Sequence, residues 1–384
     1  MKRVKTILTI FIVLICTIFT TGCWNYKEVD EMAIVAGVAV DKSENDKYLV
    51  TAEILHISGG KDTKIESKTI TASGETMFDA VRNEISLTGE RLYWGHAKVL
   101  ILSKEVAAEG VMKVIDWYIR DSETRNEVFI LVSRGSSARE IFHGQKSTEE
   151  IKSFALEKMI KSQRNLSKAP IINVLQFDND MEGEGISPIA PVVDLINDEG
   201  KMLPQIMGTA IFKKDKLVGF LNGEETKDLL FIRNEIKGGV LVEGTKGNDI
   251  STPVSLEIFK SKTKVVPVVD AQGIGISLNI KTSVAIDEIG GTENLIEDKG
   301  RLKLEQSAEK SLKGQIEALV EKIQSQYKSD IFGFGARLRE DNIGAWKDVG
   351  SNWEKIFESL KVDVATKVHI ENSATHSRPL KAGD

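Results

Sequence analysis

The chain has 384 residues, 41% of them hydrophobic, which is enough for two or three domains with cores of their own. Its formal charge of −6 at pH 7 argues against nucleic acid as a partner, because that function requires a basic face. Both cysteines, Cys16 and Cys23, lie at the start of the chain, so the rest of the molecule is expected to fold without an intramolecular disulfide.

The first residues have the parts of a secretory signal peptide. A basic start is followed by an apolar run over residues 7–19 and by Thr-Thr-Gly-Cys, which ends at Cys23. The run is shorter than the about 20 residues that a membrane-spanning helix needs. The ending resembles the lipobox of bacterial lipoproteins, with Thr20 where that family usually has leucine. The resemblance implies a leader over residues 1–22 and a lipid on the sulfur of Cys23; the alternative is an ordinary signal peptide or a start-transfer anchor.

Loss of this leader would remove three basic residues and no acidic ones, which changes the formal charge from −6 to −9. Electrostatic adhesion to anionic lipid is therefore not expected. Two acyl chains on a lipidated cysteine suffice for stable membrane binding, whereas a single chain is marginal. The sequence thus predicts a protein attached through Cys23 to the extracytoplasmic face of a membrane, with Trp24 and Tyr26 at the interface.

Residues 75–141 alternate helix and strand patterns after three predicted strands, which favours a mixed sheet with helices packed on it. Apolar and β-branched runs predict strands over 32–41, 48–55, 64–72, 92–102, 127–132 and 188–194. Amphipathic spacing and capping residues predict helices over 104–119 and 147–163, with shorter ones near 76–85, 136–141 and 171–177. An exposed acidic loop is expected over 178–185, and a domain boundary over 197–201.

The chain after residue 200 has a more antiparallel character. The predicted elements are a hairpin of 207–212 with 217–221, a helix over 222–233, strands near 239–243, 253–259, 264–269 and 273–286, helices over 305–327 and 346–360, and a strand over 362–370. We therefore expect an α+β, multidomain fold with mixed and antiparallel sheets. Residues 23–200 form an N-terminal mixed α/β domain, 201–300 a mainly antiparallel β region, and 301–384 a C-terminal region with two helices and a strand; a single unit over 201–384 is the alternative.

Residues that carry chemistry in enzymes form no recognisable constellation in the sequence. The histidines are dispersed and lack metal-ligand spacing: His56, His96, His143, His369 and His376. The carboxylates over 178–184 lack the ligand spacing of a calcium loop. The glycine pairs in 183–185 and 273–275 lack the third glycine and the strand-to-helix context of a dinucleotide loop. The sequence therefore predicts no enzyme activity, no cofactor and no metal.

One aromatic turn is a candidate contact for a partner protein. Phe332 and Phe334 alternate with Gly333 and Gly335 directly after the long predicted helix. If the glycines expose the two rings, they form apolar surface of the kind found at binding sites. The alternative is a turn whose rings fill the core against the long helix.

Four blocks of the sequence resemble the Ger(x)C family, the C subunits of spore-germination nutrient receptors in endospore-forming bacteria. The blocks are 23–29 with 36–41, 89–96 with 98–102, 208–219 with 224–226, and 327–335 with Trp346 and Trp353. They cover essentially the whole chain after the leader, in the order of the family. The start Cys23-Trp24 and the run Ser-Asp-Ile-Phe-Gly-Phe-Gly ending at Gly335 are the most specific parts.

The resemblance implies a non-enzymatic lipoprotein of several mixed α/β domains on the outer face of the spore inner membrane. It also implies two partners, a polytopic B subunit and a partly membrane-embedded A subunit, and it supplies no ligand residues. Whether this subunit binds the nutrient directly stays open. The other interpretation is a lipoprotein that binds a small solute for an importer, which predicts two Rossmann-like lobes around a cleft. The alternating strands after residue 200 argue against it.

Overall fold

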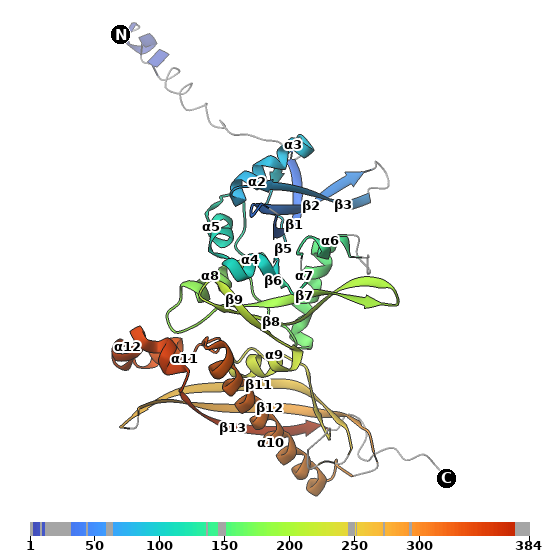
Figure 1. The fold of residues 1–384 in the computed structure, drawn as a ribbon, viewed down its shortest axis with the longest axis vertical. Coiled ribbons are helices and arrows are strands. Elements are labelled where there is room, and N and C mark those ends of the chain that lie inside the picture. Colours follow the sequence, from blue (N-terminus) through green and yellow to red (C-terminus); the bar gives the residue numbers. More distant parts are fainter. Residues whose placement is uncertain are drawn as a thin grey trace.

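The computed structural model describes residues 3–7, 10–11, 32–43, 45–58, 64–135, 137–144, 151–244, 250, 252–271, 273–291 and 294–372. Within these ranges the chain forms two β-sheets with helices between and around them (Figure 1). The predicted α+β, multidomain fold class is confirmed. No helix of the described residues is both long enough and apolar enough to cross a membrane. Cys23 lies outside the described ranges.

The first sheet has nine strands within the described chain and a parallel centre. The strands are β1 (Met32–Lys42), β2 (Tyr48–Ser58), β3 (Lys64–Gly74), β4 (Arg91–Tyr93), β5 (Val99–Leu102), β6 (Phe129–Ser133), β7 (Ile189–Asp198), β8 (Lys201–Lys213) and β9 (Lys216–Leu221). Their order is β3-β2-β1-β5-β6-β7-β8-β9, and β4 pairs with the start of β1. The pairs from β1 to β7 through β5 and β6 are parallel. Parallel pairs need crossover connections, and these contain the helices of this half.

Helices cover both faces of the first sheet. They are α2 (Met77–Asn83), α3 (Ile85–Thr88), α4 (Lys104–Glu109), α5 (Met112–Arg120), α6 (Glu140–His143), α7 (Lys152–Ser162) and α8 (Val174–Glu182). In β5, Leu100 and Leu102 share a core with α4 and α5, whereas Val99 and Ile101 share one with α6 and α7. Burial on both faces explains why the central strands are continuous apolar runs and do not alternate.

The second sheet contains four strands of the described chain, in the order β10-β11-β12-β13. They are β10 (Val240–Glu243), β11 (Val254–Asp270), β12 (Gly273–Ile289) and β13 (Lys361–Asn372). The strands β11 and β12 form an antiparallel hairpin, and β13 pairs with β12 in parallel.

The helices of this half are α9 (Gly223–Ile232), α10 (Asp298–Lys322), the π-helical turn η3 (Ile323–Tyr327), α11 (Phe334–Asp341), α12 (Ile343–Val349), the 3₁₀ turn η4 (Gly350–Asn352) and α13 (Trp353–Phe357). Helix α9 lies between the two sheets, because it contacts β8 and β9 as well as β11 and β12 (Figure 1). The buried residues of this middle layer belong to one hydrophobic core that joins both halves of the chain.

Several element boundaries differ from the sequence prediction for local reasons. The strand expected over 92–102 is divided into β4 and β5 by a turn at Gly95. The helix expected over 104–119 is broken at Gly110, whose φ is 132° and whose Cβ, if present, would lie 2.5 Å from an oxygen of Asp215. The helix expected over 346–360 consists of α12, η4 and α13.

The acidic stretch also needs correction, and the expected domain boundary lies within the first sheet. The exposed loop expected over 178–185 is helical as far as Glu182, at the end of α8. The boundary expected over 197–201 is the turn of the β7–β8 hairpin, in which Asp198 pairs with Lys201. Because β9 pairs with β8, the first sheet continues to Leu221, and the division between the sheets follows that residue. Residues 147–150, at the start of the helix expected over 147–163, lie outside the described residues, and α7 begins at Lys152.

Candidate functional site

A buried aspartate organises the turn between α10 and α11. The carboxylate of Asp330 accepts hydrogen bonds from the backbone N–H groups of Gly333 (2.9 Å), Phe334 (3.2 Å) and Gly335 (2.9 Å). It also accepts one from the indole Nε1 of Trp353, at 2.9 Å. The three backbone donors lie at the N-terminus of α11, where N–H groups have no partner within the helix. Asp330 therefore fixes the start of α11 and ties it to α13.

Burial and hydrogen bonding act in opposite directions on this carboxyl group. Asp330 is 6% exposed. Burial raises the pKa of its carboxyl and the four donors lower it, and the pKa that results is about 6, above the ordinary value of 3.8. The group therefore ionises just below neutral pH. Hydrogen bonds hold its negative charge, and no cation of the described chain pairs with it.

Two glycines bring the halves of the chain into backbone contact. A Cβ atom at Gly335 would lie 2.6 Å from the Cα of Gly185 and 2.4 Å from the indole nitrogen of Trp353. The backbone N–H of Ala336 donates to the carbonyl of Gly185 at 2.9 Å. Only residues without a side chain fit at these two positions. We refer to Gly185, Asp330, Gly335 and Trp353 together as the junction.

Two further side chains connect β8 and α8 to this turn. The hydroxyl of Ser329 donates to the carbonyl of Phe212 in β8, at 2.6 Å. The side chain of Arg233 is 11% exposed. It donates to the carbonyl of Ile331 at 3.0 Å and to the carboxylate of Asp180 in α8 at 3.1 Å. The end of α9, the end of α8 and the turn after α10 are thereby held together around one guanidinium group.

A cleft of about 1110 Å³ lies beside the junction and is lined by both halves of the chain. Lys213 and Asp215 line it from the β8–β9 hairpin, and Trp346 lines it from α12. The indole of Trp346 donates to Glu184 at 3.1 Å, and Lys213 pairs with Glu354 at 3.2 Å. Its described lining combines aromatic, basic and acidic groups and contains no histidine or cysteine. This chemistry suits non-covalent contact with a partner.

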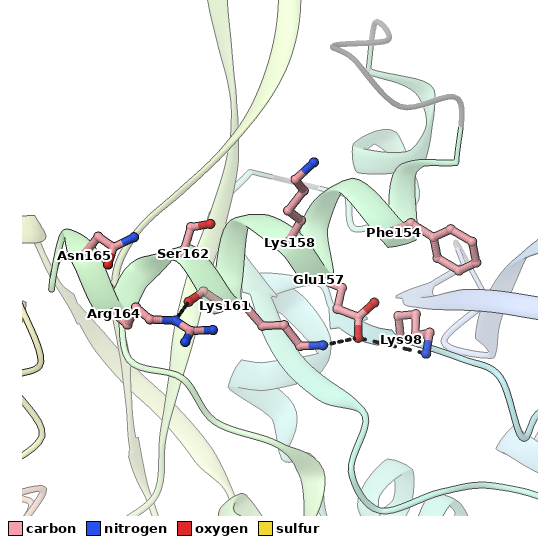
Figure 2. Close-up of a pocket in the computed structure, with 8 residues that line it drawn as sticks. All are labelled: Lys98, Phe154, Glu157, Lys158, Lys161, Ser162, Arg164 and Asn165. Atoms are coloured by element: carbon pink, nitrogen blue, oxygen red, sulfur yellow. Dashed lines mark hydrogen bonds and ion pairs between the residues drawn. The ribbon is translucent and has the colours of Figure 1, made fainter.

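A shallower hollow of about 740 Å³ follows α7 (Figure 2). Glu157 pairs with Lys161 at 2.8 Å and with Lys98 at 4.0 Å. The Nε of Arg164 donates to the carbonyl of Lys161 at 3.0 Å. Figure 2 shows Lys158 pointing away from this row, on the other side of the helix. The cations thus do not converge on one point, so we do not regard this hollow as the functional site.

Buried carboxylates also hold α6 and α7 against the first sheet. Glu53 in β2 is 1% exposed and accepts from the backbone N–H groups of Lys152 (2.9 Å) and Ser153 (2.8 Å) at the start of α7. Asp41 in β1 accepts from the backbone N–H of Ala138, at 2.6 Å, just before α6. These carboxylates serve the fold, because their acceptor positions are taken by the chain itself.

The structure places both rings of the candidate aromatic contact in the core. Phe332 is 6% exposed and Phe334 is 0% exposed. Their ring centroids are 5.0 Å apart and lie 6.2 and 6.4 Å from that of Phe357. The rings therefore do not form exposed surface. Because Asp330 folds the turn inward, they fill the core, as in the alternative interpretation.

The remaining sequence predictions concern Cys23, metal ligands and Asp180. Cys23 lies outside the described ranges, so its lipidation stays a prediction. Among the described residues, no three His, Cys, Asp or Glu side chains are close enough to hold a metal ion. Asp180, expected in an exposed loop, lies in α8 and pairs with Arg233.

The junction was missed at the level of sequence, although one of its signals is visible there. Asp330 precedes Gly333 by three positions, as a capping side chain precedes the first turn of a helix. The capped helix α11 was not expected, because Gly333 and Gly335 indicate a turn. Gly185 and Trp353 are distant in sequence, and no local pattern connects them with Asp330.

These features define a two-sheet α+β protein whose halves are joined by buried polar contacts. The chain belongs to a family of spore germination proteins. The spore germination protein N-terminal domain matches residues 25–195, and the spore germination B3/GerAC-like C-terminal domain matches residues 207–374. The resemblance to the Ger(x)C family, the C subunits of germinant receptors, is thereby confirmed. The two matched regions meet close to residue 200, although the first sheet continues across that point.

Relatives are similar to the chain over nearly their whole length. Spore germination protein B3 of Bacillus subtilis (strain 168) is 27% identical over 90% of this chain and 93% of the relative. Spore germination protein KC of the same organism is 22% identical over 98% of each chain, and GerQC of Bacillus cereus is 22% identical over 94% and 97%. The crystal structure of the GerBC protein is 25% identical, with a TM-score of 0.58, over 88% of this chain and 97% of that chain.

Proposed function

We propose that this protein is a lipid-anchored, non-enzymatic subunit of a spore germinant receptor, which assembles with the integral membrane A and B subunits to trigger germination. The observation that carries the proposal is the family match, which extends over both halves of the chain in order, from residue 25 to residue 374. The matched region begins two positions after Cys23. A lipid at Cys23 therefore attaches the N-terminal half directly to the extracytoplasmic face of the membrane.

The arrangement of the buried carboxylates supports a non-enzymatic role. A general acid or base must reach the substrate that it protonates or deprotonates. Asp41 and Glu53 instead accept hydrogen bonds from backbone N–H groups of neighbouring segments. Asp330 lines the cleft, but its carboxylate is held by three backbone N–H groups and by Trp353. The cleft beside the junction, with its aromatic and charged lining, offers a surface for contact with the membrane subunits.

Replacement of Cys23 tests the anchor. In sporulating cells supplied with labelled palmitate, we expect the wild-type protein to take up the label and Cys23→Ala to lose it, because no thiol remains at the lipidation position. Cys16→Ala is the matched control, since it removes the other cysteine, within the apolar run. It should label like the wild type. Equal labelling and equal membrane recovery of Cys23→Ala and wild type would contradict the anchor.

Calorimetry with amino acids and sugars separates this proposal from a solute-binding role. The two sheets of the described chain differ in strand number and topology, whereas an importer receptor predicts two similar lobes. We expect no stoichiometric binding by the isolated protein. A clear stoichiometric heat with one of these solutes would favour the solute-binding interpretation.

A further inference from the structure

The second sheet leaves one of its faces uncovered by the described chain. Its inner face carries buried residues such as Leu278 and Ile280 and packs on α9 and α10. Alternate residues of a strand point to opposite faces. The opposite face carries exposed lysines in its central part: Lys260, Lys262 and Lys264 in β11, Lys281 in β12 and Lys367 in β13. We refer to these five residues as the lysine face. Toward its ends the opposite face also carries Glu257 and the ion pair of Lys361 with Asp363.

Three of these lysines form a row across the sheet. Lys262 pairs with Lys281, and Lys281 pairs with Lys367. Directly opposite side chains have Cβ atoms about 5 Å apart, and like charges at that separation destabilise a sheet. Lys367 is bound by Glu309 at 2.8 Å, but Lys262 and Lys281 have no ion pair with any described residue. The fold thus keeps two adjacent cations that the described chain does not neutralise.

Protection of a sheet edge does not account for this row. Lysines on an exposed edge strand prevent sheets from pairing with one another. That role fits the lysines of β11, which extends past β10 because β10 pairs only with residues 254–257. Lys281, however, lies in β12, between β11 and β13. At the other edge of the sheet, the backbone N–H of Ile370 in β13 already donates to the carboxylate of Glu305 in α10, at 2.8 Å.

We propose that the lysine face is a docking surface for an extended acidic segment of a partner protein. The whole chain has a formal charge of −6, so a concentrated basic face is a local departure that directs an acidic partner to one place. Lys260, Lys262 and Lys264 recur at every second residue of β11, a repeat of about 6.6–6.8 Å. An extended segment with acidic residues at alternating positions has the same repeat.

A lipid surface is the less favoured occupant of this face. Helix α9 lies between the sheets, so it separates the second sheet, which carries the lysine face, from the first sheet (Figure 1). The eight residues between Cys23 and Met32 span at most about 30 Å, so a lipid on Cys23 keeps the first sheet near the membrane. The preference for a protein over a lipid rests on the anchor proposed above.

A peptide-binding experiment tests the docking surface. The binding experiment uses a variant from which residues 1–22 are removed and which carries Cys23→Ala, so that no lipid contributes to binding. The probe is a short fluorescent peptide with glutamate at alternating positions and threonine between them, and its control has glutamine in place of glutamate. At about 50 mM salt we expect binding of the acidic peptide only, and weaker binding as the salt concentration rises.

Matched variants locate the binding on the sheet. Lys262→Gln with Lys281→Gln should weaken binding of the acidic peptide roughly fivefold, because two ion pairs are lost. Lys201→Gln with Lys216→Gln changes two exposed lysines of the first sheet and should leave it unchanged. Failure of the unsubstituted protein to bind the acidic peptide, or an equal loss in both variants, would overturn the proposal.

Vesicles with about 30% phosphatidylglycerol provide the remaining arm of the experiment. Binding to these vesicles that depends on Lys262 and Lys281, without binding of the acidic peptide, would overturn the proposal and assign the face to lipid. Absence of vesicle binding alongside peptide binding is the expected result. Because the variant used for binding carries no anchor, the result does not depend on the palmitate labelling of Cys23. One of the two proposals can therefore be contradicted without the other.

Discussion

The two sheets of this protein differ in how their faces are covered. In the first sheet, helices pack on both faces, and all four residues of β5 are fully buried. In the second sheet, α9 and α10 pack on one face, and the other face presents exposed lysines. The centre of the first sheet is therefore internal, whereas the second sheet presents one face of its own central strands to solvent.

Charged groups follow the same division. In the first sheet and at the junction, the carboxylates of Asp41, Glu53 and Asp330 are buried and bound by backbone donors. On the open face of the second sheet, Lys262 and Lys281 lie side by side in solvent. The effect of removing a charge should therefore depend on whether its partners belong to the chain. Substitutions of the same residue type in the two regions test this difference.

The largest effect on stability is expected at Asp330. Asp330→Ala leaves three backbone N–H groups and the indole of Trp353 without their acceptor in a buried site. It should lower the free energy of unfolding by about 3–4 kcal/mol. Asp363→Ala, on the open face of the second sheet, should change it by less than about 0.5 kcal/mol. Chemical denaturation measures both values, and similar losses in the two variants would break the comparison.

The next effect is a pH dependence caused by Glu84, at the end of α2. Glu84 is fully buried, and burial raises the pKa of its carboxyl to about 9, from an ordinary value of 4.5. At pH values between these two pKa values, Glu84 is protonated in the folded state and ionised in the unfolded state. The contribution of Glu84 to stability is therefore fully present at low pH and declines as pH rises, by about 1.4 kcal/mol per pH unit.

Glu84→Gln should remove most of this decline, because glutamine does not titrate. Two other buried acids, Asp228 and Asp330, have pKa values raised by burial to about 7 and about 6, so they affect mainly the range below pH 7. Urea denaturation at several pH values between 7 and about 9 isolates Glu84. An identical pH slope in the variant and the wild type would show that Glu84 is ionised in the folded protein.

A smaller loss is expected from closing the space at the junction. Gly335→Ala places a methyl group 2.4 Å from the indole nitrogen of Trp353 and 2.6 Å from the Cα of Gly185. We expect it to lower the free energy of unfolding by about 2 kcal/mol. Gly314→Ala is the matched control, because apart from its chain neighbours and the adjacent backbone of α10, no atom lies within 4 Å of the added Cβ. It should stabilise the protein by about 0.5–1 kcal/mol. A change of the same sign in both variants would argue against tight packing at the junction.

The smallest effect is expected on the lysine face. Lys281→Gln removes a cation from between Lys262 and Lys367 and should raise the free energy of unfolding by about 0.5 kcal/mol. Lys216→Gln, on an exposed position of β9, should leave it unchanged. Thermal unfolding at low salt shows the difference most clearly, since salt screens the repulsion. Destabilisation by Lys281→Gln would mean that the row is not repulsive.

Elements with one buried face could be predicted well from the sequence. Residues 273–286 alternate between apolar and polar side chains, and they form most of β12, whose inner face alone is covered. The central strands of the first sheet are continuous apolar runs, so their existence could be predicted but not their neighbours. The order β1-β5-β6-β7 depends on which crossover helix packs on which face, and no local pattern records that.

The junction could not be predicted for a related reason. A glycine pair around Phe334 indicates a turn, and only the carboxylate of Asp330 makes the same residues the first turn of α11. The close approach of Gly185 to Gly335 joins positions far apart in the sequence. Cys23 presents the opposite case: its local pattern predicts lipidation, and the described fold does not test that prediction.

Assembly with membrane subunits is tested most directly by purification of the tagged protein from detergent-extracted spore membranes. Mass spectrometry then identifies and quantifies the proteins that accompany it. We predict that the partly membrane-embedded A subunit and the polytopic B subunit of one germinant receptor are recovered in amounts similar to that of the tagged chain. Recovery of the chain alone, or together with the permease of an importer in place of receptor subunits, would contradict the proposed function.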